Sequence, residues 1–194
     1  NGKFKDCAAS FRPEYIVHLG SRSSVVYSWK HPAETIRKNT GIFTSIIEAI
    51  RTENIKCRLL SVGSAEEYGM VKEDQLPITE SLNPNPASPY GVSRVMQQNL
   101  AEVYSNNYGL DIVHTRSFNH IGPYQSSDFV LSSFARQIIK QKREGLKEIE
   151  IAVGNIEVTR DFTDVRDVVR AYYLLLLRLL QRVLLQMQIK IMQR

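Results

Sequence analysis

The sequence predicts an α/β protein built on a doubly wound parallel sheet. Short apolar runs, such as residues 15–19 and 58–62, alternate with longer segments whose apolar residues recur at helical spacing. Strands that are apolar at successive positions are typical of parallel sheets with helices on both faces. With 194 residues, the chain is long enough for one domain and part of a second.

The elements are expected in this order along the first half of the chain. The first strand covers residues 15–19, and a helix precedes it. A long helix is predicted at 32–52, where isoleucines recur at helical spacing. The second strand, at 58–62, leads into a long segment, 63–89, that carries four prolines and is therefore predicted to be loop.

Ser88 and Pro89 then have the features of a helix start, since serine caps the first turn and proline is tolerated there. This helix is expected to extend to about Tyr108, with Val92, Val95, Met96, Asn99 and Val103 on one face. The remaining expected elements are a strand at 111–116, a helix at 129–143, a strand at 149–153 and a helix from Val165 onward.

Charge and composition exclude several functional classes. The net charge is +5, but residues 171–194 contain four basic residues and no acid, so residues 1–170 carry only +1. No basic face with interleaved aromatic residues results, and we expect no nucleic-acid partner. Cys7 and Cys57 lack metal-ligand spacing and are expected to be reduced thiols. The four histidines also lack ligand spacing, so no metal site is expected.

The beginning of the chain bears on localisation and on the cofactor site. Its first residues are polar and do not form a signal peptide, so a cytoplasmic protein without a membrane partner is expected. A dinucleotide-binding domain opens with a strand, a glycine-rich turn and a helix. No GxGxxG occurs here. We therefore expect the chain to begin part-way into such a domain, after a missing segment of roughly 50–60 residues.

Tyr90 and Arg94 are the residue pair that most clearly indicates chemistry. Four residues apart in a predicted helix, their side chains lie on one face, one turn from each other. A phenol exchanges protons poorly at neutral pH unless a neighbouring cation stabilises the phenolate. Ser64 and Glu66 follow the second strand at its carboxyl end, which is where open α/β sheets bind ligands.

Five stretches together resemble the extended short-chain dehydrogenase/reductases that modify nucleotide sugars, also known as the NAD-dependent epimerase/dehydratase family. They are residues 17–24, 63–69, 88–94, 116–123 and 154–167. The runs FNHIGP (118–123) and RDFTDVRD (160–167) are most similar to GDP-4-dehydro-6-deoxymannose reductases, and next to GDP-mannose 4,6-dehydratases.

The resemblance implies a division of the chain into two parts. Residues 1–118 would be the remainder of a Rossmann-like dinucleotide-binding domain, truncated at its N-terminus. Residues 119–194 would be part of a smaller C-terminal substrate-binding region, with a strand and a helix around 149–176. The tail, 174–194, departs from the family pattern because it lacks glycine, proline, aspartate and asparagine. It is interpreted as an altered sequence, with a basic amphipathic helix as the alternative.

The resemblance also implies catalytic roles. Tyr90 matches the family's acid–base tyrosine, and Ser64 matches the residue that hydrogen-bonds the reacting sugar oxygen. Glu66 matches the acid that dehydratases use as a base beside a ketone, whereas Ala65 lacks the polar side chain that dehydratases often have there, which favours a reductase. Arg94 stands where the family has lysine, and this departure is the main question about catalysis.

Binding residues follow from the same resemblance. Asn119 and Arg160, together with Ser64, are expected to bind the GDP-sugar substrate, although Arg160 could instead pair with Asp164 or Asp167. The cofactor is expected to be NAD or NADP, a choice that this sequence leaves open. The residues expected to bind it are Leu19, Gly20, Ser21, Asn39, Tyr90, Arg94 and Phe118.

The implied function is NAD(P)-dependent reduction of a GDP-4-keto-6-deoxyhexose at C4. A GDP-mannose 4,6-dehydratase or a sugar-nucleotide epimerase is the alternative within the same enzyme class. A non-catalytic homologue that binds a nucleotide sugar is a further alternative, because of Arg94 and the absent glycine turn. The resemblance also implies a homodimer through the helices after Pro32 and Pro89, for which Ile46, Ile50, Val103 and Tyr104 are the expected contacts.

Overall fold

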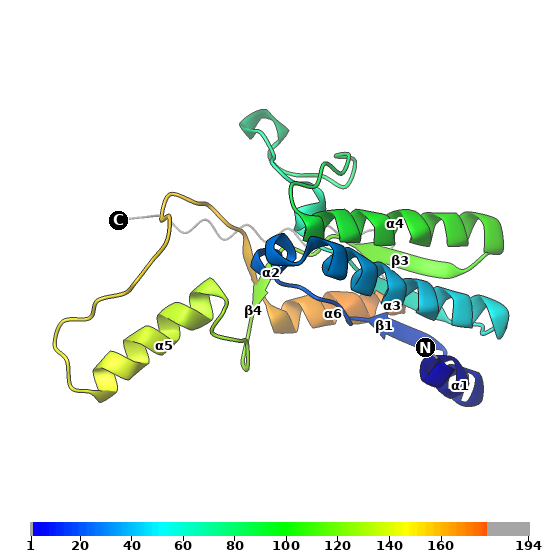
Figure 1. Cartoon of the computed structure of the whole chain (residues 1–194), viewed down its shortest axis with the longest axis horizontal. Helices are drawn as coiled ribbons and strands as arrows, with labels where there is room; N and C mark the ends of the chain where they lie inside the picture. Colours follow the sequence, from blue (N-terminus) through cyan, green and yellow to red (C-terminus); the bar gives the residue numbers. More distant parts are fainter. Residues whose placement is uncertain (1, 178–194) are drawn as a thin grey trace. The chain divides into compact units, whose positions relative to one another are not determined.

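A computed structural model describes residues 2–177, and these residues form two compact units (Figure 1). The first comprises residues 2–117 and 170–177, and the second comprises residues 118–169. Residues 174–177, the first part of the tail that departs from the family pattern, group with the first unit, and the rest of the tail lies outside the described residues.

A three-stranded parallel sheet forms the centre of the first unit. Its strands are β1 (Tyr15–His18), β2 (Arg58–Val62) and β3 (Asp111–Thr115), and they lie side by side in that order. The sequence predictions for all three strands are confirmed to within one residue. The predicted α/β class with a parallel sheet is therefore confirmed.

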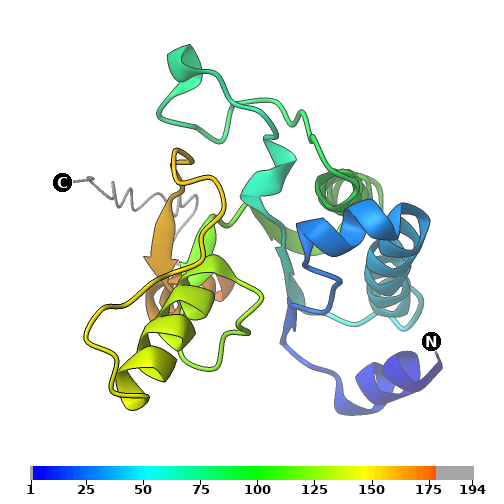
Figure 2. The same ribbon diagram turned by 60° about the vertical axis from the view of Figure 1, so that its left-hand side comes forward.

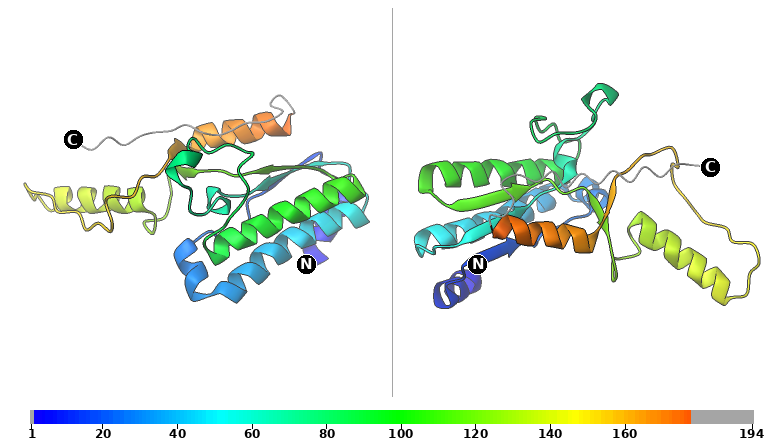
Figure 3. Two further views of the ribbon diagram at one scale, coloured as in Figure 1. Left: turned by 90° about the horizontal axis from the view of Figure 1, so that it is seen from above. Right: turned by 180° about the vertical axis from the view of Figure 1, so that it is seen from behind.

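Helices α3 (Pro32–Thr52) and α4 (Pro89–Tyr108) run side by side in the first unit (Figure 3). Both begin and end where the sequence predicts. Helix α1 (Gly2–Phe11) packs against α3, and a short helix that was not predicted, α2 (Val25–Lys30), contacts both α3 and α4. One cluster of buried apolar residues in this unit consists of Ala8, Phe43, Ile46, Ile47, Ile50, Ile55, Leu59 and Ala101.

One face of this sheet changes from apolar to polar along the strands. The register aligns Ile16, Leu59 and Ile112 in one row, and these residues belong to or pack against the apolar core. The next row on the same face, two residues nearer the carboxyl ends, is His18, Ser61 and His114. Polar groups are thus concentrated at the edge of the sheet where parallel-sheet proteins bind ligands.

Helix α4 buries its polar face, which reverses the usual pattern. Its buried residues are Tyr90, Gly91, Ser93, Arg94, Gln97 and Ala101. In contrast, Val92, Met96 and Val103, which the sequence places on one face, are exposed. The polar face of α4 is buried because it packs against the polar row of the sheet, where Gln97 donates to Ser61 Oγ at 2.8 Å. The hydrophobic pattern of this helix therefore marks its outer surface.

The second unit contains α5 (Val130–Arg143) and a parallel strand pair, β4 (Asn119–Ile121) with β5 (Phe162–Asp164). Helix α6 (Val165–Leu176) begins where predicted and continues into the first unit. The predicted strand at 149–153 is wrong, since this segment has no strand partner among the described residues. The two strands of this unit were not predicted.

Glutamine side chains explain why the 149–153 segment is not a strand. Gln141 both donates to and accepts from the backbone of Glu150, at 2.6 and 3.0 Å. Gln137 does the same with Ala152, at 3.3 and 2.8 Å. Four residues of helix rise by about 6 Å, and two extended residues span about 6.6 Å, so the two spacings match. The helix thus takes the place of a neighbouring strand (Figure 2).

The loop at 63–89 contains two short 3₁₀ turns, η1 (Ala65–Glu67) and η2 (Glu73–Gln75), and is otherwise irregular, as predicted. Arg116 secures it by donating to the carbonyl oxygens of Glu80 and Leu82, at 3.3 and 3.2 Å. The same guanidinium lies over the ring of Tyr68. Within residues 2–177, no helix is long and apolar enough to cross a membrane.

Candidate active site

Ser64 lies directly beyond the carboxyl end of β2. The backbone pairing with β3 continues past both strands, since Gly63 N donates to Thr115 O at 2.7 Å and Ala65 N donates to Ser117 O at 2.9 Å. Ser64 Oγ accepts from Glu66 N at 3.2 Å and so caps turn η1. A hydroxyl that accepts one hydrogen bond can still donate its own hydrogen to a ligand.

Glu67 closes the same turn from a fully buried position. Its Oε1 accepts from Ser64 N at 2.8 Å, which completes a capping box. Gly63 is required here, because a Cβ at that position would lie 2.2 Å from Glu67 Oε1 and 2.4 Å from His114 Nε2. The sequence pattern Ser64–x–x–Glu67 is a signal for this capping box, whereas only Glu66 was expected to have a role at this turn.

Tyr90 and Arg94 form a buried hydrogen-bonded pair, as their spacing predicts. Arg94 Nε donates to Tyr90 Oη at 3.1 Å, and both residues are less than one-tenth exposed. The other guanidinium nitrogens are anchored to the sheet edge: Nη1 donates to Val62 O at 3.1 Å and to Gln97 Oε1 at 2.7 Å, and Nη2 donates to Ser21 Oγ. A fixed cation therefore lies against the phenol oxygen.

Asn39 positions the segment after β1. Its side-chain amide accepts from Arg22 N at 2.8 Å and donates to Arg22 O at 3.2 Å and to Ser93 Oγ at 3.0 Å. Ser93 in turn donates to Tyr90 O at 2.7 Å. Buried Asn39 thereby links residues 19–22 to α4 and holds Ser21 within reach of Arg94.

Turn η1 packs directly against the first turn of α4. A Cβ on Gly91 would lie 2.6 Å from Glu66 O, so only glycine allows this approach. Ser88, the N-cap of α4, donates to Glu66 Oε2 at 3.5 Å. The predicted residues Ser64 and Glu66 are therefore carried by a turn that contacts the helix bearing Tyr90.

Three predicted binding residues belong to the second unit, namely Phe118, Asn119 and Arg160. Asn119 begins β4, and its side chain is exposed. Arg160 is also exposed and donates to the neighbouring Thr159 O at 2.9 Å. The ion pair of Asp164 in the structure is with Arg166, at 2.6 Å, and not with Arg160.

A second buried tyrosine, Tyr172 of α6, lies in the first unit near Tyr90 and Arg94 and was not predicted as a site residue. Its Oη lies 2.5 Å from Ser117 Oγ. Burial raises the pKa of Tyr172, so this phenol remains neutral. Nothing in its sequence context distinguishes it from the apolar residues of α6.

His18 makes stability depend on pH. Burial lowers its pKa from 6.5 to about 4, and the charge of Arg94, with His114 when protonated, acts in the same direction. Because the unfolded chain then binds more protons than the folded one, stability is lost as pH falls from about 6.5 to about 4. At ~1.4 kcal/mol per pKa unit, the loss is on the order of 3 kcal/mol.

We predict that replacing His18 with leucine removes this part of the pH dependence. Urea unfolding near pH 7 and near pH 4 measures the effect, and His120→Leu, which changes an exposed histidine, is the matched control. If the unsubstituted protein and His18→Leu lost the same amount of stability on acidification, His18 would not be the source of this pH dependence.

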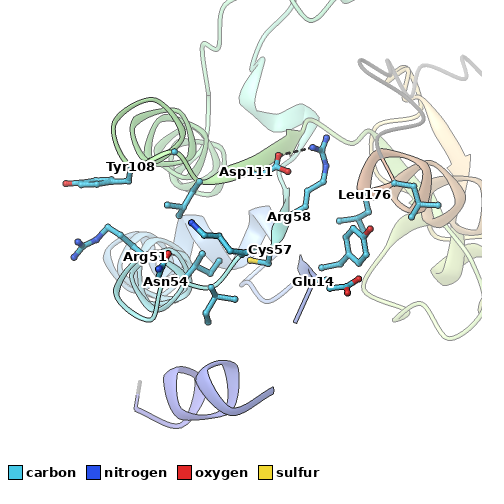
Figure 4. Close-up of a pocket in the computed structure, with 15 residues that line it drawn as sticks. Glu14, Arg51, Asn54, Cys57, Arg58, Tyr108, Asp111 and Leu176 are labelled. Atoms are coloured by element: carbon cyan, nitrogen blue, oxygen red, sulfur yellow. Dashed lines mark hydrogen bonds and ion pairs between the residues drawn. The ribbon is translucent and has the colours of Figure 1, made fainter. Parts of the chain in front are cut away.

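A cavity of about 520 Å³ lies at the opposite edge of the sheet, at the amino ends of the strands (Figure 4). Its lining includes Cys57, whose thiol pKa is raised by burial, and the ion pair of Arg58 with Asp111 at 2.8 Å. None of the predicted site residues lines it. Parallel sheets bind their ligands at the carboxyl edge, so this cavity is not the catalytic site.

A family model described as GDP-mannose 4,6 dehydratase matches residues 2–184, nearly the whole chain. The chain belongs to this family. Its relatives include the GDP-6-deoxy-D-mannose reductase of Pseudomonas aeruginosa, which is 37% identical over 164 residues, covering 84% of this chain and 54% of the relative. The GDP-mannose 4,6-dehydratase of Yersinia enterocolitica is 28% identical over 167 residues, covering 85% and 44%.

The solved structure of RMD from Pseudomonas aeruginosa complexed with NADPH is also similar. It superposes with a TM-score of 0.79 at 36% identity, over 84% of this chain and 56% of that one. This similarity confirms the Rossmann-like fold class. The chain thus spans about half the length of the relatives that it matches.

Proposed function

We propose that the protein is an NAD(P)H-dependent nucleotide-sugar reductase that reduces a GDP-4-keto-6-deoxyhexose at C4. The observation that carries the proposal is the hydrogen bond from Arg94 to the phenol of Tyr90, beside the turn that presents Ser64. The 37% identity to a GDP-6-deoxy-D-mannose reductase supports the choice of substrate. The similarity to a structure complexed with NADPH supports the choice of cofactor.

The donors at the sheet edge fit a nicotinamide cofactor. A guanidinium has five N–H groups, and the bonds of Arg94 to described residues use four of them. One N–H on Nη2 therefore remains for a ribose hydroxyl, beside Leu19, Gly20 and Ser21. When bound, the reduced nicotinamide would supply the hydride. Phe118 is also proposed to contact the cofactor.

The protein side of the reaction is a proton transfer. Tyr90 would give its phenolic proton to the oxygen on C4 as that oxygen gains negative charge, and Ser64 would donate a hydrogen bond to the same oxygen. Arg94 stabilises the resulting phenolate across the 3.1 Å contact. Asn119 and Arg160 are proposed to bind the substrate, Arg160 through a diphosphate oxygen.

A 4,6-dehydratase is the second candidate, because Glu66 stands at the Ser64 turn and could remove a proton beside a ketone. The chain is also 28% identical to a GDP-mannose 4,6-dehydratase. Ala65 favours the reductase. The test is to supply the purified protein with GDP-mannose in one reaction and with its 4-keto-6-deoxy product plus NADPH in another.

A reductase consumes only the 4-keto sugar and oxidises NADPH in equal amount. A dehydratase converts GDP-mannose instead, without net oxidation of the cofactor. Consumption of neither substrate, although both bind, would contradict catalysis and support the non-catalytic alternative.

We also propose a cytoplasmic homodimer. The expected contact surface needs correction, because Ile46 and Ile50 are buried in the core and Tyr104 packs against it, donating to Glu48 at 2.6 Å. The exposed residues Val92, Met96 and Val103, on one face of α4, remain as the dimer surface. At most one of the four contacts expected from sequence, Val103, therefore belongs to it.

Met96→Lys is predicted to convert the dimer into a monomer, since it would bury a charge in an apolar contact. Sedimentation at micromolar concentration measures the change. Glu102→Lys, on another face of α4, is the control and should leave the dimer intact. A protein that is already monomeric before substitution would contradict the proposal.

A further inference from the structure

An unbroken series of hydrogen bonds joins Arg94 to Glu67. Arg94 Nη1 donates to Gln97 Oε1 at 2.7 Å, and Gln97 Nε2 donates to Ser61 Oγ at 2.8 Å. Ser61 Oγ lies 2.9 Å from His114 Nδ1, and His114 Nε2 lies 3.2 Å from each carboxylate oxygen of Glu67. We refer to Gln97, Ser61 and His114 as the relay.

Every donor in the relay points the same way. Gln97 Nε2 can only donate, so Ser61 Oγ accepts from it and gives its own hydrogen to His114 Nδ1. His114 Nε2 then carries the hydrogen that faces Glu67. A neutral imidazole with its hydrogen on Nε2 satisfies both contacts, and this assignment follows from the network.

The two ends of the relay carry opposite charges. Arg94 is buried, and its hydrogen-bond partners in the described chain are neutral: Tyr90, Val62, Gln97 and Ser21. Glu67 is fully buried. Buried charges require compensation, and a polarised series of hydrogen bonds can supply it between groups that do not touch.

Two other basic groups are near these ends. Arg116 forms an ion pair with Glu67, with 3.7 Å between Nε and Oε2, and the same nitrogen also donates a hydrogen bond to Gln98 at 3.0 Å. His18, beside Arg94, is neutral near pH 7, since its pKa is about 4. The relay therefore remains the hydrogen-bonded connection between Arg94 and Glu67.

We propose that Glu67 is a positioning residue of the active site, and that it acts through the relay on Arg94 and directly on Ser64. Its Oε1 also accepts from Ser64 N at 2.8 Å. One buried carboxylate would thus fix both the cation that serves Tyr90 and the serine that binds the sugar oxygen. This inference rests on the proposed function for its catalytic meaning, but the geometry is independent of it.

The test is ¹⁵N NMR of the His114 ring and of the Arg94 side chain in the protein at neutral pH, with His114→Gln to assign the ring signals. We expect the Nε2–H tautomer and slowly exchanging Arg94 N–H signals. Glu67→Gln should give a mixture of tautomers, because an amide can present either its oxygen or its NH₂ group to the ring. The neighbouring Glu66→Gln is the control and should leave the tautomer unchanged.

Gln97→Met serves as a second variant, because it breaks the relay without removing a charge. It should abolish slow exchange at Arg94 while His114 keeps its tautomer. A dominant Nδ1–H tautomer in the unsubstituted protein would overturn the proposal. So would slow exchange of the Arg94 N–H signals that persists in folded Gln97→Met, a result that tests the relay even if Glu67→Gln does not fold.

Kinetics separates the relay from the proposed function. If the protein reduces the 4-keto sugar, both Glu67→Gln and Gln97→Met should lower kcat by about tenfold or more with little change in KM, since a displacement of ~1 Å can cost ~100-fold. The relay signature without turnover in the unsubstituted protein would mean that the proposed function, and not the relay, has failed.

Discussion

Tyr90→Phe is expected to lower kcat for reduction of the 4-keto sugar nucleotide by about 10²–10⁴-fold, the usual contribution of a positioned proton donor. Phenylalanine keeps the ring but has no hydroxyl to protonate the C4 oxygen. The substitution also removes the acceptor for Arg94 Nε, whose bond to Tyr90 is 3.1 Å long. Steady-state kinetics with NADPH measures the loss, and KM should change little.

Tyr104→Phe is the matched control for this substitution. It lies further along the same helix and loses a hydroxyl that donates to Glu48 at 2.6 Å, remote from the sheet edge. Its turnover should equal that of the unsubstituted protein. Retention of turnover in Tyr90→Phe to within a factor of about three would exclude Tyr90 as the proton donor.

Arg94→Lys is expected to raise turnover by about tenfold or more. Four of the five N–H groups of Arg94 are bonded to the protein, including one to Ser21, so a single N–H remains for the cofactor. Lysine would release Ser21 and place a compact charge with three rotatable donors beside Tyr90. Substrate affinity should change little, because Asn119 and Arg160 are the proposed substrate ligands.

Steady-state kinetics on both proteins decides this prediction, with Arg51→Lys, an exposed arginine paired with Glu48, as the control. Equal turnover would show that arginine performs the role of lysine at this position. A loss of turnover would show that the contacts with Val62 and Gln97 have made arginine indispensable.

The sequence predicted the first unit well because its signals are local. An apolar run bounded by Pro13 and Gly20 located β1, the apolar run at 58–62 located β2, and the Ser88–Pro89 cap located the start of α4. The spacing of Tyr90 and Arg94 predicted their contact, since residues four apart in a helix always lie one turn from each other.

Long-range pairing explains what the sequence did not reveal. Ser61 and His114 are 53 residues apart and meet only through the strand register, and Gln97 reaches them from α4. Residues 149–153 have a strand-like pattern, but their backbone pairs with Gln137 and Gln141 of a helix. In both cases, side chains that look like ordinary surface polar residues satisfy groups from distant segments.

Transfer of deuterium from NADPH labelled at the transferred position tests the central claim most directly. We predict that the protein, incubated with this cofactor and the GDP-4-keto-6-deoxyhexose, forms a product with deuterium on C4 of the sugar, and that Tyr90→Phe forms almost none in the same time. A reduced sugar without deuterium at C4, or no reduced sugar although cofactor and substrate both bind, would contradict the account.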